Sequence, residues 1–246
     1  TIDRLVIRDG DFDFYFTNRQ GAPQGSLTIS TQLLIADHDG TDARLSVRGG
    51  PLTTEFVSHI ASGIGSRGVL HVDGPDAVWL NHAHFDLGWV GEGSLLVTNG
   101  AHVDMRGGVF AGIRNSSEGI MTISSGGSMT VEHRVAIGSG HEATGSARGS
   151  LTVQGGGSQL ESLSLQIGAT GGSGTALVSN GGPVNTTEFI AVHSNSTLGS
   201  SLRVTGSGAA VQSSNLYVDS YGPTARVRVE NMGRADFTSA WLNGRY

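Results

Sequence analysis

The chain has 246 residues, of which 39 are glycine and none is cysteine, and its formal net charge is -6 at pH 7. The lack of cysteine excludes disulfides and thiolate metal sites, and the thinly spread basic residues argue against a nucleic-acid partner. No apolar run approaches the ~18 residues of a membrane-spanning helix. The chain starts at Thr1 with neither Met nor a signal peptide, so we expect it to be processed or excised from a longer protein.

Residues 1–43 are the less regular N-terminal part of one predicted domain that spans 1–246. The stretch DFDFYF (11–16) alternates strictly, which places Phe12, Phe14 and Phe16 on one face. We interpret these rings as a core-facing strand near the N-terminal end. The stretch 26–40 is typical of a shortened coil.

Residues 44–246 repeat one pattern about every 25 residues. Each unit contains an apolar-x-apolar pair, then a turn of small residues and two further short strands. The pairs are Leu45/Val47, Leu70/Val72, Leu95/Val97, Met121/Ile123, Leu151/Val153, Ala176/Val178, Leu202/Val204 and Val227/Val229. The second residues of these pairs are expected to stack as one inward-facing column.

The third strand of each unit ends in a corner residue of one of four types, glycine, histidine, aspartate or asparagine. These types tolerate a positive φ better than others, so one left-handed bend is predicted at every corner. The corner residues are Gly88, Gly112, Gly138, Gly168, His193, Asp219 and Asn243.

Short strands, regular bends and a fixed repeat length predict an all-β fold, a single right-handed parallel β-helix (β-solenoid). About ten coils of ~25 residues, each with three short strands, account for the length. A β-sandwich is the alternative, but it predicts hairpin turns every ~8–12 residues without strict self-similarity.

The two ends of the chain suggest a further possibility. If a second copy followed directly, Leu5 and Ile7 would fall 24 residues after Val227 and Val229, close to the repeat length. Solenoid ends expose unpaired strand edges unless something covers them. Two hypotheses remain open: excision from the middle of a longer solenoid, or end-to-end self-association of copies.

The repeat resembles the passenger domains of bacterial autotransporters. The resemblance rests on Val72-Asp73-Gly74 followed by Trp79, and on the stretches LGWVGEGSLLVTNGAHV (87–103) and SLTVQGGGSQL (150–160). It covers roughly 44–246, and it implies a parallel β-helix displayed outside the cell or on the bacterial outer membrane. Most such passengers are adhesins or aggregation factors, which implies the host or a neighbouring cell surface, a glycan or another copy as the partner.

Two groups of residues are candidate metal sites. His82, His84 and Asp86 alternate in NHAHFDL (81–87), and His59 lies 25 residues before His84, which predicts it one coil below. Imidazole and carboxylate groups gathered in this way could bind zinc or copper. The alternative is a solvated strand face that carries histidines by chance.

The second group is Asp37, Asp39 and Asp42, which surround Gly40. Carboxylates on a glycine-containing loop suit calcium, the only cofactor that the sequence suggests. The alternative is an ordinary Asp-Gly turn, because Asp and Gly are favoured in turns for their own backbone preferences.

Trp89 and Tyr221 follow corner positions, where exposed aromatic rings could stack on sugars. Trp79 and Trp241 are expected to pack at the solenoid wall. Catalysis is not expected, because most charges are isolated along the chain. We therefore expect a structural or adhesive module of a secreted or cell-surface bacterial protein. The alternatives are a head-to-tail filament or matrix subunit and, third, a carbohydrate-active β-helix.

Overall fold

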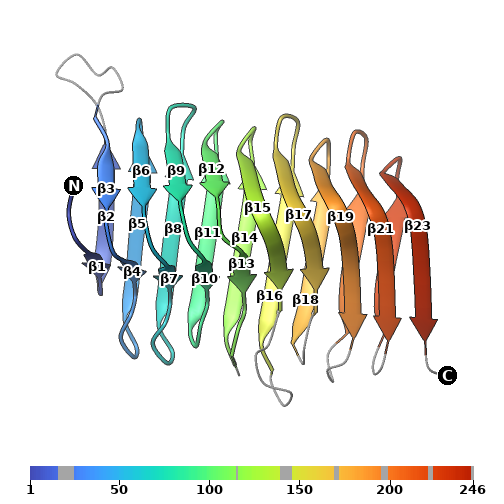
Figure 1. Cartoon of the computed structure of the whole chain (residues 1–246), viewed down its shortest axis with the longest axis horizontal. Helices are drawn as coiled ribbons and strands as arrows, with labels where there is room; N and C mark the ends of the chain where they lie inside the picture. Colours follow the sequence, from blue (N-terminus) through green and yellow to red (C-terminus); the bar gives the residue numbers. More distant parts are fainter. Residues whose placement is uncertain are drawn as a thin grey trace.

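The computed structural model describes residues 1–15, 25–114, 116–138, 146–168, 172–194, 199–220 and 224–244. In these residues the chain is an all-β parallel solenoid without helix, wound in about eight turns of about 26 residues (Figure 1). The predicted fold class is confirmed. The turns are fewer than the ten expected.

One face of the solenoid is a sheet of nine parallel strands, one from each coil. Neighbouring strands run parallel because each is reached from the last by one full turn of the chain. The strands are β2 (Gly10–Tyr15), β5 (Asp42–Arg48), β8 (Arg67–Asp73), β11 (Glu92–Thr98), β14 (Glu118–Ser124), β16 (Arg148–Gln154), β18 (Ser173–Ser179), β20 (Ser200–Thr205) and β22 (Ala225–Glu230).

The other two faces belong to a second sheet of 14 strands. In the N-terminal coils each face has its own short strands. The second strands of the coils are β3 (Leu27–Ile29), β6 (Pro51–Thr54), β9 (Val78–Asn81) and β12 (His102–Met105). The third strands are β1 (Leu5–Ile7), β4 (Leu33–Ile35), β7 (Ser58–Ile60), β10 (Phe85–Leu87) and β13 (Val109–Ala111).

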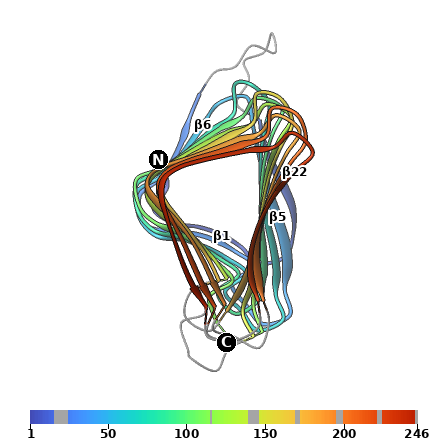
Figure 2. The ribbon, with the colours of Figure 1, turned by 90° about the vertical axis from the view of Figure 1, so that its right-hand side faces the viewer.

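These two faces merge at the fifth coil, where one long strand replaces the two short ones. The long strands are β15 (Ser128–Ile137), β17 (Gln159–Ile167), β19 (Pro183–Ser194), β21 (Ala210–Ser220) and β23 (Arg234–Gly244). β15 pairs with both β12 and β13, so it connects both lines of short strands to the long ones. Viewed down the axis, the coils superpose as a three-sided outline (Figure 2).

The predicted inward column is confirmed. The register pairs Val47 with Val72 and continues one residue per coil to Val229. Every member except Val229 is fully buried, whereas Val229 is 43% exposed because β22 is the last strand of its sheet. The alternation of apolar and polar residues in each strand therefore sets both the coil register and the core.

The corner prediction is right for the glycines and wrong for the last three coils. Gly88, Gly112, Gly138 and Gly168 have φ between 65° and 76°. At the matching place in the C-terminal coils, β19, β21 and β23 continue through His193, Asp219 and Asn243 as extended strand. The four residue types that the sequence pattern groups as corners therefore have two different backbone conformations: left-handed at the glycines, and extended at His193, Asp219 and Asn243.

Two earlier corners carry alanine, which the sequence pattern missed. Ala36 and Ala61 occupy the position after the buried Ile35 and Ile60, where the later coils have glycine. Their φ angles are 54° and 58°. A left-handed backbone at a residue with a Cβ is strained, so the bend at these corners is imposed by the coil and not by the residue.

The N-terminal end differs from two expectations. Phe12 and Phe14 pair with Leu45 and Val47 and so face inward, but Phe12 is 49% exposed because β2 is the first strand of its sheet. Phe16 lies outside the described residues.

β1 does not continue the column of Val227 and Val229. Leu5 pairs with Leu33 and Ile7 with Ile35, in the line of third strands. The expected match between the two ends is therefore wrong, because β1 is a third strand of the coil whereas Val227 and Val229 lie in a first strand. No helix in the described ranges is long and apolar enough to cross a membrane.

Candidate functional site

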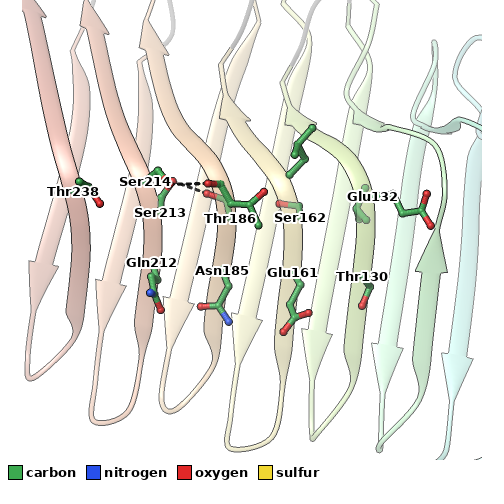
Figure 3. A pocket seen from close by; sticks show the side chains of 13 residues that line it. Thr130, Glu132, Glu161, Ser162, Asn185, Thr186, Gln212, Ser213, Ser214 and Thr238 are labelled. Atoms are coloured by element: carbon green, nitrogen blue, oxygen red, sulfur yellow. Dashed lines mark hydrogen bonds between the residues drawn. The ribbon is translucent and has the colours of Figure 1, made fainter.

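A groove of about 660 Å³ lies at the corner of the long strands. It follows the places where the strand pairings shift register, as between Ser162 and Ser164 of β17. Such bulges bend the strand and re-aim the side chains on either side of it. Figure 3 shows the resulting rows of side chains, which run across successive long strands.

One row consists of equivalent outward positions on consecutive strands. Thr130 pairs with Glu161, Glu161 with Asn185, and Asn185 with Gln212. None of these four side chains makes a hydrogen bond with another residue of the described part. Their amide, hydroxyl and carboxylate groups are therefore available to a ligand, and they recur once per coil, every ~4.8 Å.

The second row is held by its own hydrogen bonds. The Thr186 hydroxyl donates to Ser213 Oγ at 2.7 Å, and the Ser214 hydroxyl donates to the Thr187 carbonyl oxygen at 2.7 Å. Beside the groove, Asn215 Nδ2 donates to the Glu188 carbonyl oxygen at 3.0 Å. These bonds link β19 to β21, so one side of the groove is fixed while the first row stays free.

The charge of the groove is acidic. Its only charged lining residues are Glu132 of β15 and Glu161 of β17, and no arginine or histidine lines it. Most of the other lining residues are hydroxyl or amide side chains. This composition suits a neutral, hydroxyl-rich ligand better than an anionic one, because uncompensated carboxylates repel negative charge.

An aromatic pocket of about 430 Å³ lies on the face of the third strands, over β7, β10 and β13. Its lining includes Trp89, Phe110, His59, Asp86 and Arg134. The guanidinium of Arg134 lies 4.9 Å from the centre of the Phe110 ring. The pocket therefore combines aromatic surface with both signs of charge.

The structure separates most of the predicted His and Asp cluster. His59 Nδ1 lies 3.1 Å from Asp86 Oδ2, whereas His82 Nδ1 lies 2.7 Å from Glu55 Oε2. His84 Nδ1 accepts a hydrogen bond from the backbone N–H of Gly108. Across the described residues, no group of three or more His, Asp or Glu side chains is arranged to hold a metal ion.

The expected position of His59 is wrong by two residues. His59 pairs with Asp86 and not with His84. The reason is that the turn between β8 and β9 (74–77) is two residues longer than the turn between β5 and β6 (49–50), so the third strands of these two coils are not offset by the 25 residues assumed from the repeat.

Two of the three aspartates proposed for calcium have separate side-chain partners. Asp37 Oδ1 lies 3.3 Å from Arg8 Nε and 3.2 Å from His38 Nδ1. Asp39 Oδ1 accepts a hydrogen bond from the backbone N–H of Ile64 at 2.7 Å. Asp42 begins β5, where its backbone lies opposite that of Arg67 in the neighbouring strand β8. Their contacts link the first coils to one another.

The tryptophans have three different environments. Trp79 is fully buried and meets Phe85 edge to face at 4.9 Å, as predicted for a wall residue. Trp241 stacks on Tyr217 of the neighbouring strand at 4.9 Å between ring centres, so it packs against the wall, but it is 50% exposed. Trp89 is half-buried in the aromatic pocket, and Tyr221 lies outside the described residues.

Sequence reasoning missed the groove residues. Thr130, Glu161, Asn185 and Gln212 stand one residue after the buried members of the second column, which runs through Met129, Leu160, Val184 and Val211. Aligning the outward positions of the repeats would have shown this row of hydrogen-bonding residues. Whether the row borders a groove depends on the bulges, which have no sequence signal of their own.

No protein-family model, curated protein or solved structure matches this chain. By its fold, the chain belongs to the class of parallel β-solenoids.

Proposed function

We propose that the chain is a non-catalytic, adhesive module of a secreted or cell-surface protein, and that its groove binds an extended, hydroxyl-rich polymer such as a glycan. The observation that carries this proposal is the unpartnered row Thr130, Glu161, Asn185 and Gln212. A ligand lying along the axis meets an equivalent polar group at each coil. The ~4.8 Å spacing of coils is of the same order as one sugar unit in an extended chain.

The scaffold suits adhesion. The parallel sheets hold each groove residue at a fixed height, so the ligand loses freedom while the protein loses little. Each contact with Thr130, Asn185 or Gln212 is a neutral hydrogen bond worth about 0.5–1.5 kcal/mol, so affinity depends on engaging several coils at once. Short oligosaccharides should therefore bind weakly and longer ones more tightly.

The test is calorimetric titration with chitohexaose and cellohexaose. We expect the double variant Asn185→Ala/Gln212→Ala to weaken binding at least tenfold. The matched control is Gln154→Ala, which removes an exposed amide from β16 on another face of the solenoid. Equal affinity for the groove variant and the control would contradict the proposal.

Glu132 and Glu161 favour a second candidate, a carbohydrate-active solenoid, because paired carboxylates serve in glycoside hydrolysis. Incubation with the same hexasaccharides and chromatography of the products separates the two. Cleavage that disappears in Glu161→Gln would overturn the non-catalytic proposal.

The autotransporter-like origin is part of the same proposal. It is supported by the repeat of about 25 residues, whose apolar positions occupy matching places in consecutive coils. The parent gene provides the test. A translocator domain encoded in the same reading frame would support surface display, whereas a cytoplasmic enzyme domain there would contradict it.

A further inference from the structure

The aromatic pocket is flanked by cations. Arg114 lies over the Trp89 ring at 4.8 Å from its centre, and Arg134 lies over the Phe110 ring at 4.9 Å. Neither guanidinium makes an ion pair or a side-chain hydrogen bond within the described part of the chain. A stacked guanidinium keeps its in-plane N–H groups free, and these match the two oxygens of a carboxylate.

The opposite wall supplies groups for hydroxyls. Asp86 and His59 lie side by side at 3.1 Å, but His59 Nδ1 is buried without an aligned hydrogen bond in the described residues. His84 Nδ1 already accepts the N–H of Gly108, so its Nε2 carries the proton of the neutral ring and is a donor. The pocket thus offers aromatic surface, the Arg134 cation, a donor and an acceptor, while Arg114 lies against the Trp89 ring at its edge.

The pocket is continuous with the groove. A shallow depression of about 320 Å³ lies between them. It shares Leu163 with the groove and shares His84, Phe110 and Arg134 with the aromatic pocket. One extended ligand can therefore contact the acidic and neutral groove at one end and the cationic pocket at the other.

We propose that the aromatic pocket binds a carboxylated sugar residue of the ligand whose uncharged part occupies the groove. Arg134 holds the carboxylate, Phe110 and Trp89 contact the sugar ring, and Asp86 accepts from its hydroxyls. This inference rests on the proposed function, and it adds that the preferred ligand is an acidic glycan.

The experiment compares a hexasaccharide of five neutral sugars and one terminal glucuronate with the same oligosaccharide after its carboxyl group is reduced to an alcohol. Titration calorimetry at low salt is the readout. We expect the acidic form to bind at least tenfold more tightly than the reduced form. We expect Arg134→Gln to remove this preference while leaving the affinity for the reduced form within twofold.

The matched control is Arg226→Gln, an exposed arginine of β22 on another face that changes the net charge equally. If Arg226→Gln lowers the acidic preference as much as Arg134→Gln does, the effect is general charge and the inference is overturned. Thermal unfolding of both variants verifies folding.

The outcomes separate this inference from the proposed function. If both hexasaccharides bind equally and both respond to Asn185→Ala/Gln212→Ala, the groove stands and the pocket assignment fails. If neither binds to the unmodified chain, the proposed function fails with it. Tight binding of the acidic form alone, lost in Arg134→Gln, supports the pocket and contradicts the groove.

Discussion

His71 Nδ1 lies 2.9 Å from a guanidinium nitrogen of Arg44, on the neighbouring strand. Because arginine can only donate, this nitrogen of His71 must accept, which fixes the neutral ring with its proton on Nε2. That proton points to Thr98 Oγ1 at 2.8 Å, and Thr98 in turn donates to Asp73 Oδ1 at 2.9 Å. The outer face of the first sheet therefore carries one directed chain of hydrogen bonds from cation to carboxylate.

This chain predicts a dependence of stability on pH. Burial, with Arg44 and Arg48 nearby, lowers the pKa of His71 below 6.5, although Asp73 and Asp13 oppose the shift. The unfolded chain then binds more protons than the folded chain just below pH 6.5, so the free energy of unfolding falls as the pH falls through this range. Burial also lowers the pKa of His193, so this residue adds to the same dependence of the free energy of unfolding on pH. Each group contributes at most about 1.4 kcal/mol per pH unit.

Denaturant unfolding between pH 7.5 and 5 measures this slope. We expect His71→Gln to flatten it, because glutamine accepts from Arg44 and donates to Thr98 without titrating. His133→Gln is the control, since His133 is exposed on β15. A slope that stays unchanged in His71→Gln would contradict the prediction. So would a free energy of unfolding that rises as the pH falls in the unmodified chain.

The column from Val47 to Val229 allows one substitution to be compared at two depths. Val153 is fully buried and Val229 is 43% exposed, yet both occupy the same register position. Val153→Asp buries an unpaired carboxylate and should cost at least about 3 kcal/mol of unfolding free energy. Val229→Asp should cost less than about 1 kcal/mol, because water reaches its side chain. Chemical denaturation of both variants gives the comparison, and equal losses would refute the column as the core.

The regular part of this fold could be predicted from the sequence, because stacked coils repeat their apolar positions at nearly constant spacing. Val72, Val97 and Ile123 show this directly: each pairs with the next in the predicted column. The spacing says nothing about where a strand stops. His193 looks like a corner residue but lies inside β19, because β21 on one side extends past it and pairs Asp219 with His193 and Ser220 with Ser194.

The candidate site was harder to predict, because it depends on how far adjacent loops displace the register. His59 pairs with Asp86 and not His84 because the turn between β8 and β9 is two residues longer than the turn between β5 and β6. The groove depends on bulges in β15, β17 and β19, which arise from the pairing of strands and not from any one residue. Trp89 was singled out because it follows a corner glycine, but its ring is half-buried in the aromatic pocket instead of fully exposed.

A buried polar cluster near the N-terminal coils should be essential to stability. Asn81 Oδ1 accepts hydrogen bonds from Thr54 at 2.6 Å and from Ser58 at 3.0 Å, and its Nδ2 donates to the Ala83 carbonyl oxygen at 2.6 Å. Asn81→Leu keeps the branched shape of the side chain but leaves both hydroxyls without this acceptor, at a cost of about 2–4 kcal/mol. Thermal and urea unfolding measure the loss.

The control for this cluster removes the orphaned groups as well. The triple variant Thr54→Val/Ser58→Ala/Asn81→Leu should recover part of the stability, because an all-apolar replacement leaves fewer unsatisfied groups. Only part returns, since Trp79 Nε1 then loses its acceptor, Thr54 Oγ1. A triple variant less stable than the single one would show that the hydroxyls do not depend on Asn81.

The corner at the end of the third strand provides the last prediction. Gly88 has φ of 68°, and a Cβ added there would overlap the carbonyl oxygen of Glu118 in the next coil. Gly88→Ala should therefore cost more than about 3 kcal/mol, since backbone strain and a backbone clash act together. Ala61 occupies the equivalent corner with φ of 58° and already accommodates its methyl group. Ala61→Gly relieves strain but gives up burial and chain stiffness, so it should change stability by less than about 1 kcal/mol. Guanidinium unfolding of the two variants measures both changes. A small loss of unfolding free energy in Gly88→Ala would show that the coil can shift to make room for the methyl group.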